Sequence, residues 1–62
     1  MASKRHDQIR VGDIVRGADR EWWKVTNITV QSDGFRQFDT ANNSDGRPGY
    51  LSGPAWETRQ TH

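Results

Sequence analysis

Turn-forming residues interrupt this chain so regularly that little room is left for a helix. Six glycines are spread from Gly12 to Gly53, several of them beside Asp or Pro, and they divide the 62 residues into short segments. None of these segments repeats apolar residues at the spacing of an amphipathic helix. They are instead rich in Val, Ile, Thr and aromatic residues, which favour strands. The sequence therefore predicts an all-β fold.

Five segments have the composition of strands. They cover residues 9–16, 21–31, 35–41, 50–52 and 56–59. Between the second and the third, Ser32-Asp33-Gly34 predicts a tight reversal, because Gly accepts a positive φ and Asp tolerates one. Residues 1–8 and 61–62 are polar and lack periodicity. We therefore expect a mobile basic N-terminal arm and a frayed tail on either side of one domain at residues 9–60.

The second expected strand contains a break in its alternation. Two of its apolar residues, Trp23 and Val25, share one parity. Three others have the opposite parity: Trp22, Ile28 and Val30. A flat strand cannot bring all of these to one core, so we expect a bulge near Thr26-Asn27 that moves Ile28 and Val30 to the side of Trp23. Such a bulge bends a sheet sharply, and the sequence therefore predicts a small barrel of about five strongly bent antiparallel strands.

The composition excludes several classes of protein. With no cysteine, the chain forms no disulfide, no zinc–thiolate site and no thiol nucleophile. It has no apolar run long enough to span a membrane, and no apolar segment follows the basic residues near its start, as a signal peptide requires. We therefore expect a cytoplasmic protein that does not contact a membrane. Nine basic residues against eight acidic ones leave a net charge of +1, without the dense basic stripe typical of nucleic-acid binders.

Candidate catalytic groups are few. The two histidines, His6 and His62, lie in segments that we expect to be mobile, so neither is held in a catalytic geometry. Residues 39–46 carry several oxygen ligands, but not at the alternating positions of a calcium loop, and no Glu stands where such a loop closes. We expect no enzymatic activity, no metal ion and no cofactor.

Two runs of residues resemble the opening strands of SH3-like barrels. They are residues 11–16 (VGDIVR) and residues 22–25 (WWKV), followed by Ile28. In that group, which includes Tudor-like and KOW-like modules, the first strand commonly reads Gly-Asp-x-Val and pairs with a strand that holds an aromatic residue and alternating aliphatic ones. The resemblance covers about residues 9–40 and implies a single small SH3-like barrel. It implies little about function, since such barrels have many unrelated activities.

The chain also resembles the type II dihydrofolate reductases of resistance plasmids, small SH3-like barrels that act as tetramers. The similar stretches are residues 12–16 (GDIVR), and Pro48 and Gly49 followed by residues 54–57 (PAWE). That family binds folate and NADPH through a Val-Gln-Ile-Tyr segment between its Pro-Gly and its later Pro. Here residues 50–53 read Tyr-Leu-Ser-Gly, so the resemblance implies the fold without the catalytic motif.

The aromatic residues carry the clearest functional signal. We expect Trp23 and Phe38 in the core, because a domain of this size needs large rings to bury enough apolar area. Adjacent residues of a strand face opposite sides, which leaves Trp22 outside among basic residues. The candidate partner-binding residues are Trp22, Arg16, Arg20, Lys24, Arg36, Tyr50 and Trp56, with Lys4 and Arg5 on the arm.

An exposed ring among basic residues fits two classes of partner. It can anchor a protein contact, where Trp, Tyr and Arg concentrate, or stack on bases while the cations hold phosphates. A third interpretation is cation–π packing on Trp22 without a partner. The near-neutral charge favours a non-enzymatic protein-interaction module that contacts another protein or a second copy of itself, such as an accessory or inhibitor protein of a phage or other mobile element. Nucleic-acid binding is the alternative, and reductase-like activity in a tetramer is a second alternative.

Overall fold

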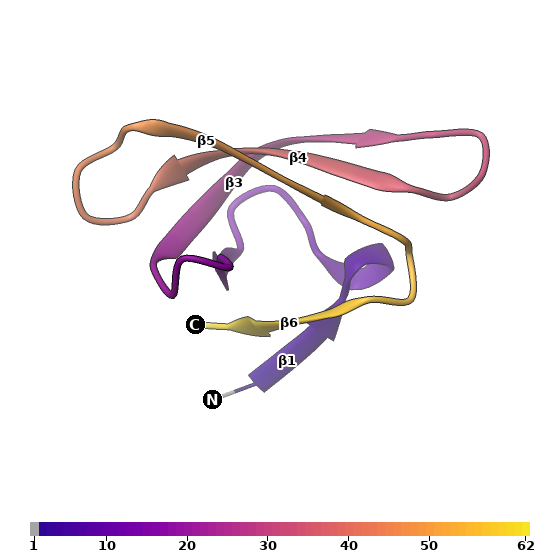
Figure 1. Ribbon diagram of the computed structural model, residues 1–62, viewed down its shortest axis with the longest axis horizontal. Coiled ribbons are helices and arrows are strands. Elements are labelled where there is room, and N and C mark those ends of the chain that lie inside the picture. Colours follow the sequence, from indigo (N-terminus) through magenta and orange to yellow (C-terminus); the bar gives the residue numbers. More distant parts are fainter. Residues whose placement is uncertain (1) are drawn as a thin grey trace.

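The computed structural model describes residues 2–62, and within them the chain forms one antiparallel sheet (Figure 1). Its strands are β1 (Ala2–Arg5), β2 (Ile14–Arg16), β3 (Trp22–Val30), β4 (Arg36–Asn42), β5 (Pro48–Gly53) and β6 (Thr58–Thr61). A single 3-10 turn, η1 (His6–Gln8), follows β1. The strand order is β1-β6-β2-β3-β4-β5, with β1 and β5 at the two edges. The all-β prediction is confirmed, with six strands in the described residues rather than about five.

The β3–β4 hairpin forms where the sequence predicts a reversal. Gly34 has a φ of 85°, and its N–H donates to the carbonyl of Gln31 over 2.9 Å. The side chain of Asp33 accepts a hydrogen bond of 2.9 Å from the N–H of Phe35, which fixes the other side of the turn. Gly and Asp thus have the roles that their turn chemistry predicts.

The predicted bulge in β3 is confirmed. Val25 pairs with Thr40 and Asn27 pairs with Asp39, so Thr26 is the extra residue. Its hydroxyl donates to the carbonyl of Asp39 over 3.0 Å. The bulge brings Ile28 against the core, as expected. Val30 also lies on the predicted side, but it remains 58% exposed because β3 extends past the core.

The core lies inside the bend of the sheet. In Figure 1 the β3–β4–β5 part of the sheet lies above the β1–β6 part. Both parts contribute buried residues, such as Val25 and Phe38 from the first and Thr61 from the second. The buried cluster consists of Ile9, Val15, Val25 and Phe38, with Ile28 and Leu51 packed against it. Phe38 and Trp23 are both buried, which confirms their predicted places.

The N-terminal segment differs from the mobile arm that the sequence predicts. Residues 2–5 form β1, which pairs with β6 from Ala2 opposite Thr61 to Arg5 opposite Thr58. Residue 1, the first of that arm, lies outside the described residues. The alternation that would reveal a strand is absent because β1 is held by backbone pairing at a sheet edge and not by apolar side chains.

The C-terminal residues differ from the expected frayed tail for the same reason. Thr61 is buried and pairs with both Ala2 and Val15, and the N–H of His62 donates to the carbonyl of Ile14 over 2.8 Å. The two ends of the chain therefore complete the sheet together. No helix within residues 2–62 has the length and hydrophobicity needed to cross a membrane.

Candidate functional site

Trp22 lies on the outer face of the sheet, opposite to the buried Trp23. Arg16 pairs with it across β2 and β3, and the guanidinium of Arg16 lies 5.0 Å from the centroid of the indole ring. The ring of His62 meets the indole edge-on, with centroids 5.3 Å apart. Trp22 is therefore half-buried rather than fully exposed, and the cation–π contact expected of an unpartnered ring is present.

The other cations predicted beside Trp22 lie in three different parts of the structure. Lys24 shares the face of Trp22 and is exposed, whereas Arg20 is exposed in the β2–β3 turn with a φ of 65°. Arg36 is not part of the Trp22 surface, because it pairs with Val30 at the far end of the hairpin and has the parity of the buried Phe38. Its Nη1 donates to the carbonyl of Gly34 over 2.6 Å.

The two cations expected on the arm both form ion pairs. Lys4 Nζ lies 3.1 Å from Asp13, and Arg5 Nη2 lies 2.6 Å from Asp7. The first pair joins β1 to the segment before β2, and the second lies between β1 and η1. Both cations therefore take part in local structure rather than in a free basic patch.

The remaining two predicted aromatic residues are exposed at separate positions. Tyr50 lies in the edge strand β5 and is 56% exposed, and Trp56 lies in the connection between β5 and β6 and is 72% exposed. The structure therefore divides the predicted residues among the Trp22 face, the β5 edge and the β5–β6 connection.

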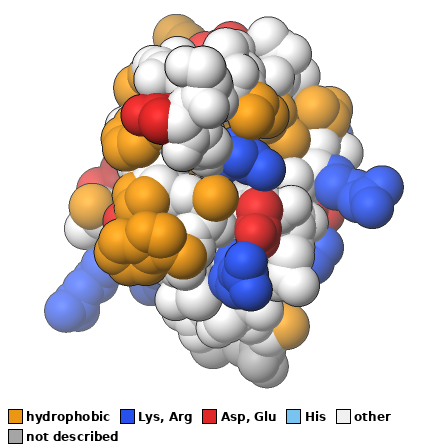
Figure 2. Space-filling model, turned by 90° about the vertical axis from the view of Figure 1, so that its right-hand side faces the viewer, with side chains coloured by type: hydrophobic (Ala, Val, Ile, Leu, Met, Phe, Trp, Pro, Cys, Tyr) orange, Lys and Arg blue, Asp and Glu red, His pale blue; other side chains and the backbone are white. Residues whose placement is uncertain are grey.

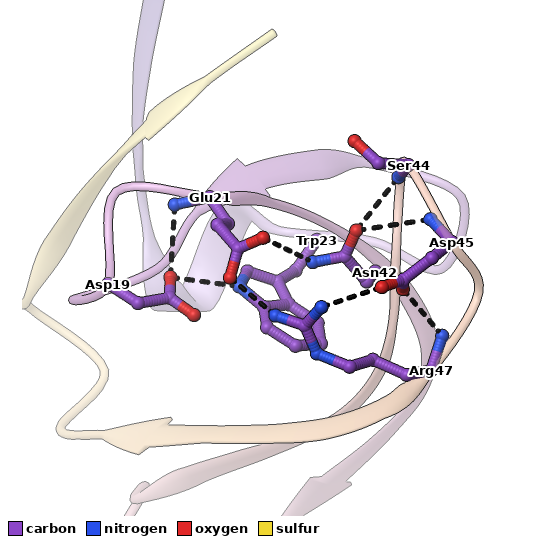
Figure 3. Close-up of polar contacts among 7 residues, drawn as sticks. All are labelled: Asp19, Glu21, Trp23, Asn42, Ser44, Asp45 and Arg47. Carbon is purple, nitrogen blue, oxygen red and sulfur yellow. Dashed lines mark hydrogen bonds and ion pairs between the residues drawn. The ribbon is translucent and has the colours of Figure 1, made fainter.

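Trp23 is the centre of a polar network that the sequence did not predict (Figure 3). Its Nε1–H donates to Asp19 over 3.1 Å. Gly17 and Gly49 lie so close to the indole that a Cβ at either position would overlap it. The side chain is thus fixed by one hydrogen bond and by the close packing of two glycines, where any Cβ would force it to shift.

Arg47 joins the two turns that meet beside this ring. Its guanidinium lies 5.3 Å from the centroid of the Trp23 ring and forms ion pairs with Asp45 and Glu21 (Figure 3). The side-chain hydrogen bond to Asp45 is the main cause that raises the pKa of Arg47. Glu21 also accepts from Asn42 over 3.2 Å. The β2–β3 and β4–β5 turns are therefore connected by charge as well as by the sheet.

A pocket of about 280 Å³ opens next to Trp23. It lies between the β2–β3 turn and β5, and its lining residues are Ala18, Asp19, Trp23, Gly49, Tyr50 and Leu51. The backbone N–H of Glu21, and then the indole of Trp23, hold the pKa of Asp19 below its usual range. The pocket thus combines aromatic and aliphatic walls with one ionised carboxylate.

Of these lining residues, only Tyr50 was among the predicted partner-binding residues. The network was missed because Glu21 and Arg47 lie 26 residues apart, so no local spacing indicates that their turns meet. The one local signal is Asp19 four residues before Trp23, a separation that a turn can close into a hydrogen bond.

The sequence predicts His6 in a mobile arm, and this is wrong, because the structure buries the residue. It is 1% exposed, and its Nε2 accepts a hydrogen bond of 2.9 Å from Nε of Arg59. Its ring meets that of Phe38 edge-on, with centroids 5.1 Å apart. Burial is the main cause that lowers the pKa of His6, and the charge of Arg59 adds to it, against an opposing effect of Glu57. A neutral imidazole in this position supports the sheet and is not accessible for catalysis.

Within residues 2–62, no group of three or more His, Asp or Glu side chains is placed to hold a metal ion. The chain matches no protein-family model, and no curated protein is similar enough to count as a relative.

Proposed function

We propose that this chain is a non-enzymatic protein-binding module whose main contact is Trp56. The observation that carries the proposal is that this indole is 72% exposed, whereas residues 2–62 bury only five hydrophobic side chains. Tryptophan is the residue type most enriched among the side chains that dominate binding energy at protein interfaces.

The turn that carries Trp56 is fixed on both sides. The N–H of Asp7 donates to the carbonyl of Ala55 over 3.1 Å, and the N–H of His6 donates to that of Glu57 over 2.7 Å. A further bond of 3.1 Å joins the N–H of Glu57 to the carbonyl of Pro54. An anchor on a rigid turn loses little conformational entropy on binding, which favours affinity.

The surroundings of this turn also suit an interface. Figure 2 looks onto the end of the molecule that holds the β3–β4 turn and the β5–β6 connection, and hydrophobic side chains gather there with basic side chains beside them. Val30, at the end of β3, is exposed as well. An apolar centre with a charged rim is the usual composition of a protein-binding surface.

Capture experiments with matched variants test this function. Immobilised protein is incubated with lysate of the cells that carry the gene, and the proteins retained are quantified for the wild type, Trp56→Ala and Val11→Ala. Val11 is the control because it is 61% exposed but is not aromatic. We expect Trp56→Ala to weaken retention at least tenfold and Val11→Ala to leave it unchanged. Equal retention by all three proteins would contradict the proposal.

The same variants decide whether the partner is a second copy of this chain. Sedimentation of the purified wild type over a range of concentrations measures self-association. If the partner is another copy, the wild type forms a dimer or larger assembly that Trp56→Ala loses. A monomer at all concentrations assigns the surface to a different protein.

Nucleic-acid binding is the second candidate function, and it is favoured by one observation on another face. Arg16 and Lys24 flank Trp22, and neither forms an ion pair with a carboxylate within residues 2–62. Cations beside a ring can hold phosphates while the ring stacks on a base. Titration with single- and double-stranded DNA and RNA at low salt tests it. Binding that weakens as salt rises and is lost in Arg16→Gln supports it, and no binding by the wild type contradicts it.

A further inference from the structure

We propose that the pocket beside Trp23 binds a cationic side chain, the guanidinium of an arginine or the ammonium of a lysine, presented by a partner protein. This inference rests on the proposed protein-binding function, because it specifies the chemistry of the partner. It uses the β5 edge of the sheet and does not require Trp56.

The walls of the pocket suit a cation with an aliphatic stem. The indole of Trp23 offers an aromatic surface, and Gly49, Tyr50 and Leu51 of β5 line the other side of the pocket. A cation near the face of a ring is attracted by the negative potential of that face, and the stems of Arg and Lys pack on apolar surface while their charge remains near water.

One wall of the pocket is held in place before any partner binds. The Trp23 indole is fixed by its hydrogen bond to Asp19 and by the close approach of Gly17 and Gly49. Because this wall does not need to be ordered on binding, less conformational entropy is lost when a side chain enters.

The carboxylate of Asp19 supplies the complementary charge. Its Oδ1 accepts both the N–H of Glu21, over 3.0 Å, and the indole N–H of Trp23, over 3.1 Å. No Lys or Arg side chain of residues 2–62 forms an ion pair with it. The carboxylate is thus positioned by neutral donors, and its negative charge remains available to a cation from outside.

The chain already holds one guanidinium with the same combination of groups. Arg47 lies over the Trp23 ring and pairs with the carboxylates of Glu21 and Asp45. These two carboxylates and Asp19 give three negative charges around the ring against the one positive charge of Arg47. The β2–β3 turn, which carries Asp19 and Glu21, contains one further cation, the exposed Arg20. An anionic group would meet Asp19 unfavourably, whereas a cation complements it.

Two small probes that differ only in charge test the pocket. N-acetyl-arginine amide carries the guanidinium, and N-acetyl-citrulline amide replaces it with a neutral group of the same shape. Each is titrated into the wild-type protein, and the NMR signal of the Trp23 indole N–H is followed. We expect the arginine probe to shift this signal in a saturable way and to bind at least tenfold more tightly than the citrulline probe.

Two matched variants assign the effect to Asp19. Asp19→Asn removes the charge but keeps an oxygen that can accept from Glu21 and Trp23, and we expect it to weaken the arginine probe at least fivefold. Asp33→Asn is the control, since Asp33 accepts from the N–H two residues later in the same way but lies in the β3–β4 turn. It should leave binding unchanged. A thermal melt of each variant confirms that it is folded.

The outcomes of these titrations test the cation pocket separately from the protein-binding function. Equal binding of the two probes, no shift up to the solubility of the arginine probe, or the same loss in Asp33→Asn overturns the cation pocket. If the probe does not bind but a captured protein still depends on Trp56, the protein-binding function stands and only this inference fails. If the probe binds as expected but no captured protein depends on Trp56, the pocket stands and the proposed function fails.

Discussion

Nε of Arg59 donates a hydrogen bond of 2.9 Å to Nε2 of His6, between residues that lie 53 positions apart in the chain. Because Nε2 is the acceptor, the imidazole is neutral and carries its proton on Nδ1. The contact joins β6 to η1 at the place where the two ends of the chain complete the sheet. Protonation of Nε2 would break this bond and place an imidazolium beside the guanidinium of Arg59, a repulsion that the carboxylate of Glu57, 3.6 Å from Nε2, offsets only in part.

This relationship predicts that the protein loses stability in mildly acidic solution. The pKa of His6 in the folded chain is lowered from its ordinary value of 6.5 by burial, so the unfolded chain binds a proton at higher pH than the folded one. The contribution of the neutral His6 to the free energy of unfolding is therefore complete above about pH 6.5. It is lost as the pH falls from there towards the pKa of His6 in the folded chain. Urea unfolding at a series of pH values measures it.

The second histidine is the control for this prediction. His62→Gln should retain the pH dependence, because it leaves the contact between His6 and Arg59 intact, whereas His6→Gln should remove the part of it that lies just below pH 6.5. His6→Gln is also expected to be less stable at neutral pH, since a buried ring is lost. A pH profile that is identical in wild type and His6→Gln would show that the imidazole does not titrate as proposed.

Removal of β1 is predicted to destabilise the sheet. A mobile arm could be deleted without effect, but residues 2–5 pair with β6 along its whole length. Loss of these backbone hydrogen bonds should lower the free energy of unfolding by about 2 kcal/mol or more. Thermal unfolding of a chain that lacks residues 1–5 measures this, and an unchanged midpoint would mean that β1 contributes nothing to stability.

The strands β3, β4 and β5 and the bulge could be predicted because they depend on local sequence patterns. The change of parity between Val25 and Ile28 is visible in the sequence, and Thr26 is the residue that absorbs it. The same bulge explains the error at Arg36. Arg36 pairs with Val30, which lies beyond the bulge at Thr26. The side chain of Arg36 is therefore on the face of the sheet opposite to that of Trp22.

The parts that could not be predicted depend on pairings between distant segments. β1 has no apolar alternation, and it forms a strand because its backbone pairs with the edge of β6. Trp22 was correctly placed outside, but its cover comes partly from His62 at the other end of the chain. The site around Trp23 requires Glu21 and Arg47 to meet, which only the assembled sheet achieves. Kinship with SH3-like barrels stays a prediction from the sequence.

The ion pairs of Arg47 are predicted to stabilise the fold more than an ordinary surface pair. Arg47 pairs with carboxylates from two different turns and lies over the Trp23 ring of β3, whereas within residues 2–62 Arg5 pairs only with Asp7, two residues away. Charge networks that join separate segments contribute more than isolated exposed pairs, and salt screens both. Arg47→Met should therefore lower the thermal midpoint more than Arg5→Met, and the difference should narrow in concentrated salt. Equal midpoints for the two variants would contradict a joining role for Arg47.

The contact between Gly49 and Trp23 predicts a specific effect of a single methyl group. Alanine at position 49 would overlap the indole, so Gly49→Ala should lower the free energy of unfolding by about 1–3 kcal/mol and shift the tryptophan fluorescence. Gly46→Ala is the control: it has a φ of 77° and open space around it, so it should destabilise through backbone strain of about 1–2 kcal/mol with no change in emission. Because Trp23 also forms a wall of the pocket, Gly49→Ala should weaken the arginine probe while Gly46→Ala does not. Identical emission maxima in wild type and Gly49→Ala would show that the indole of Trp23 is not packed against β5.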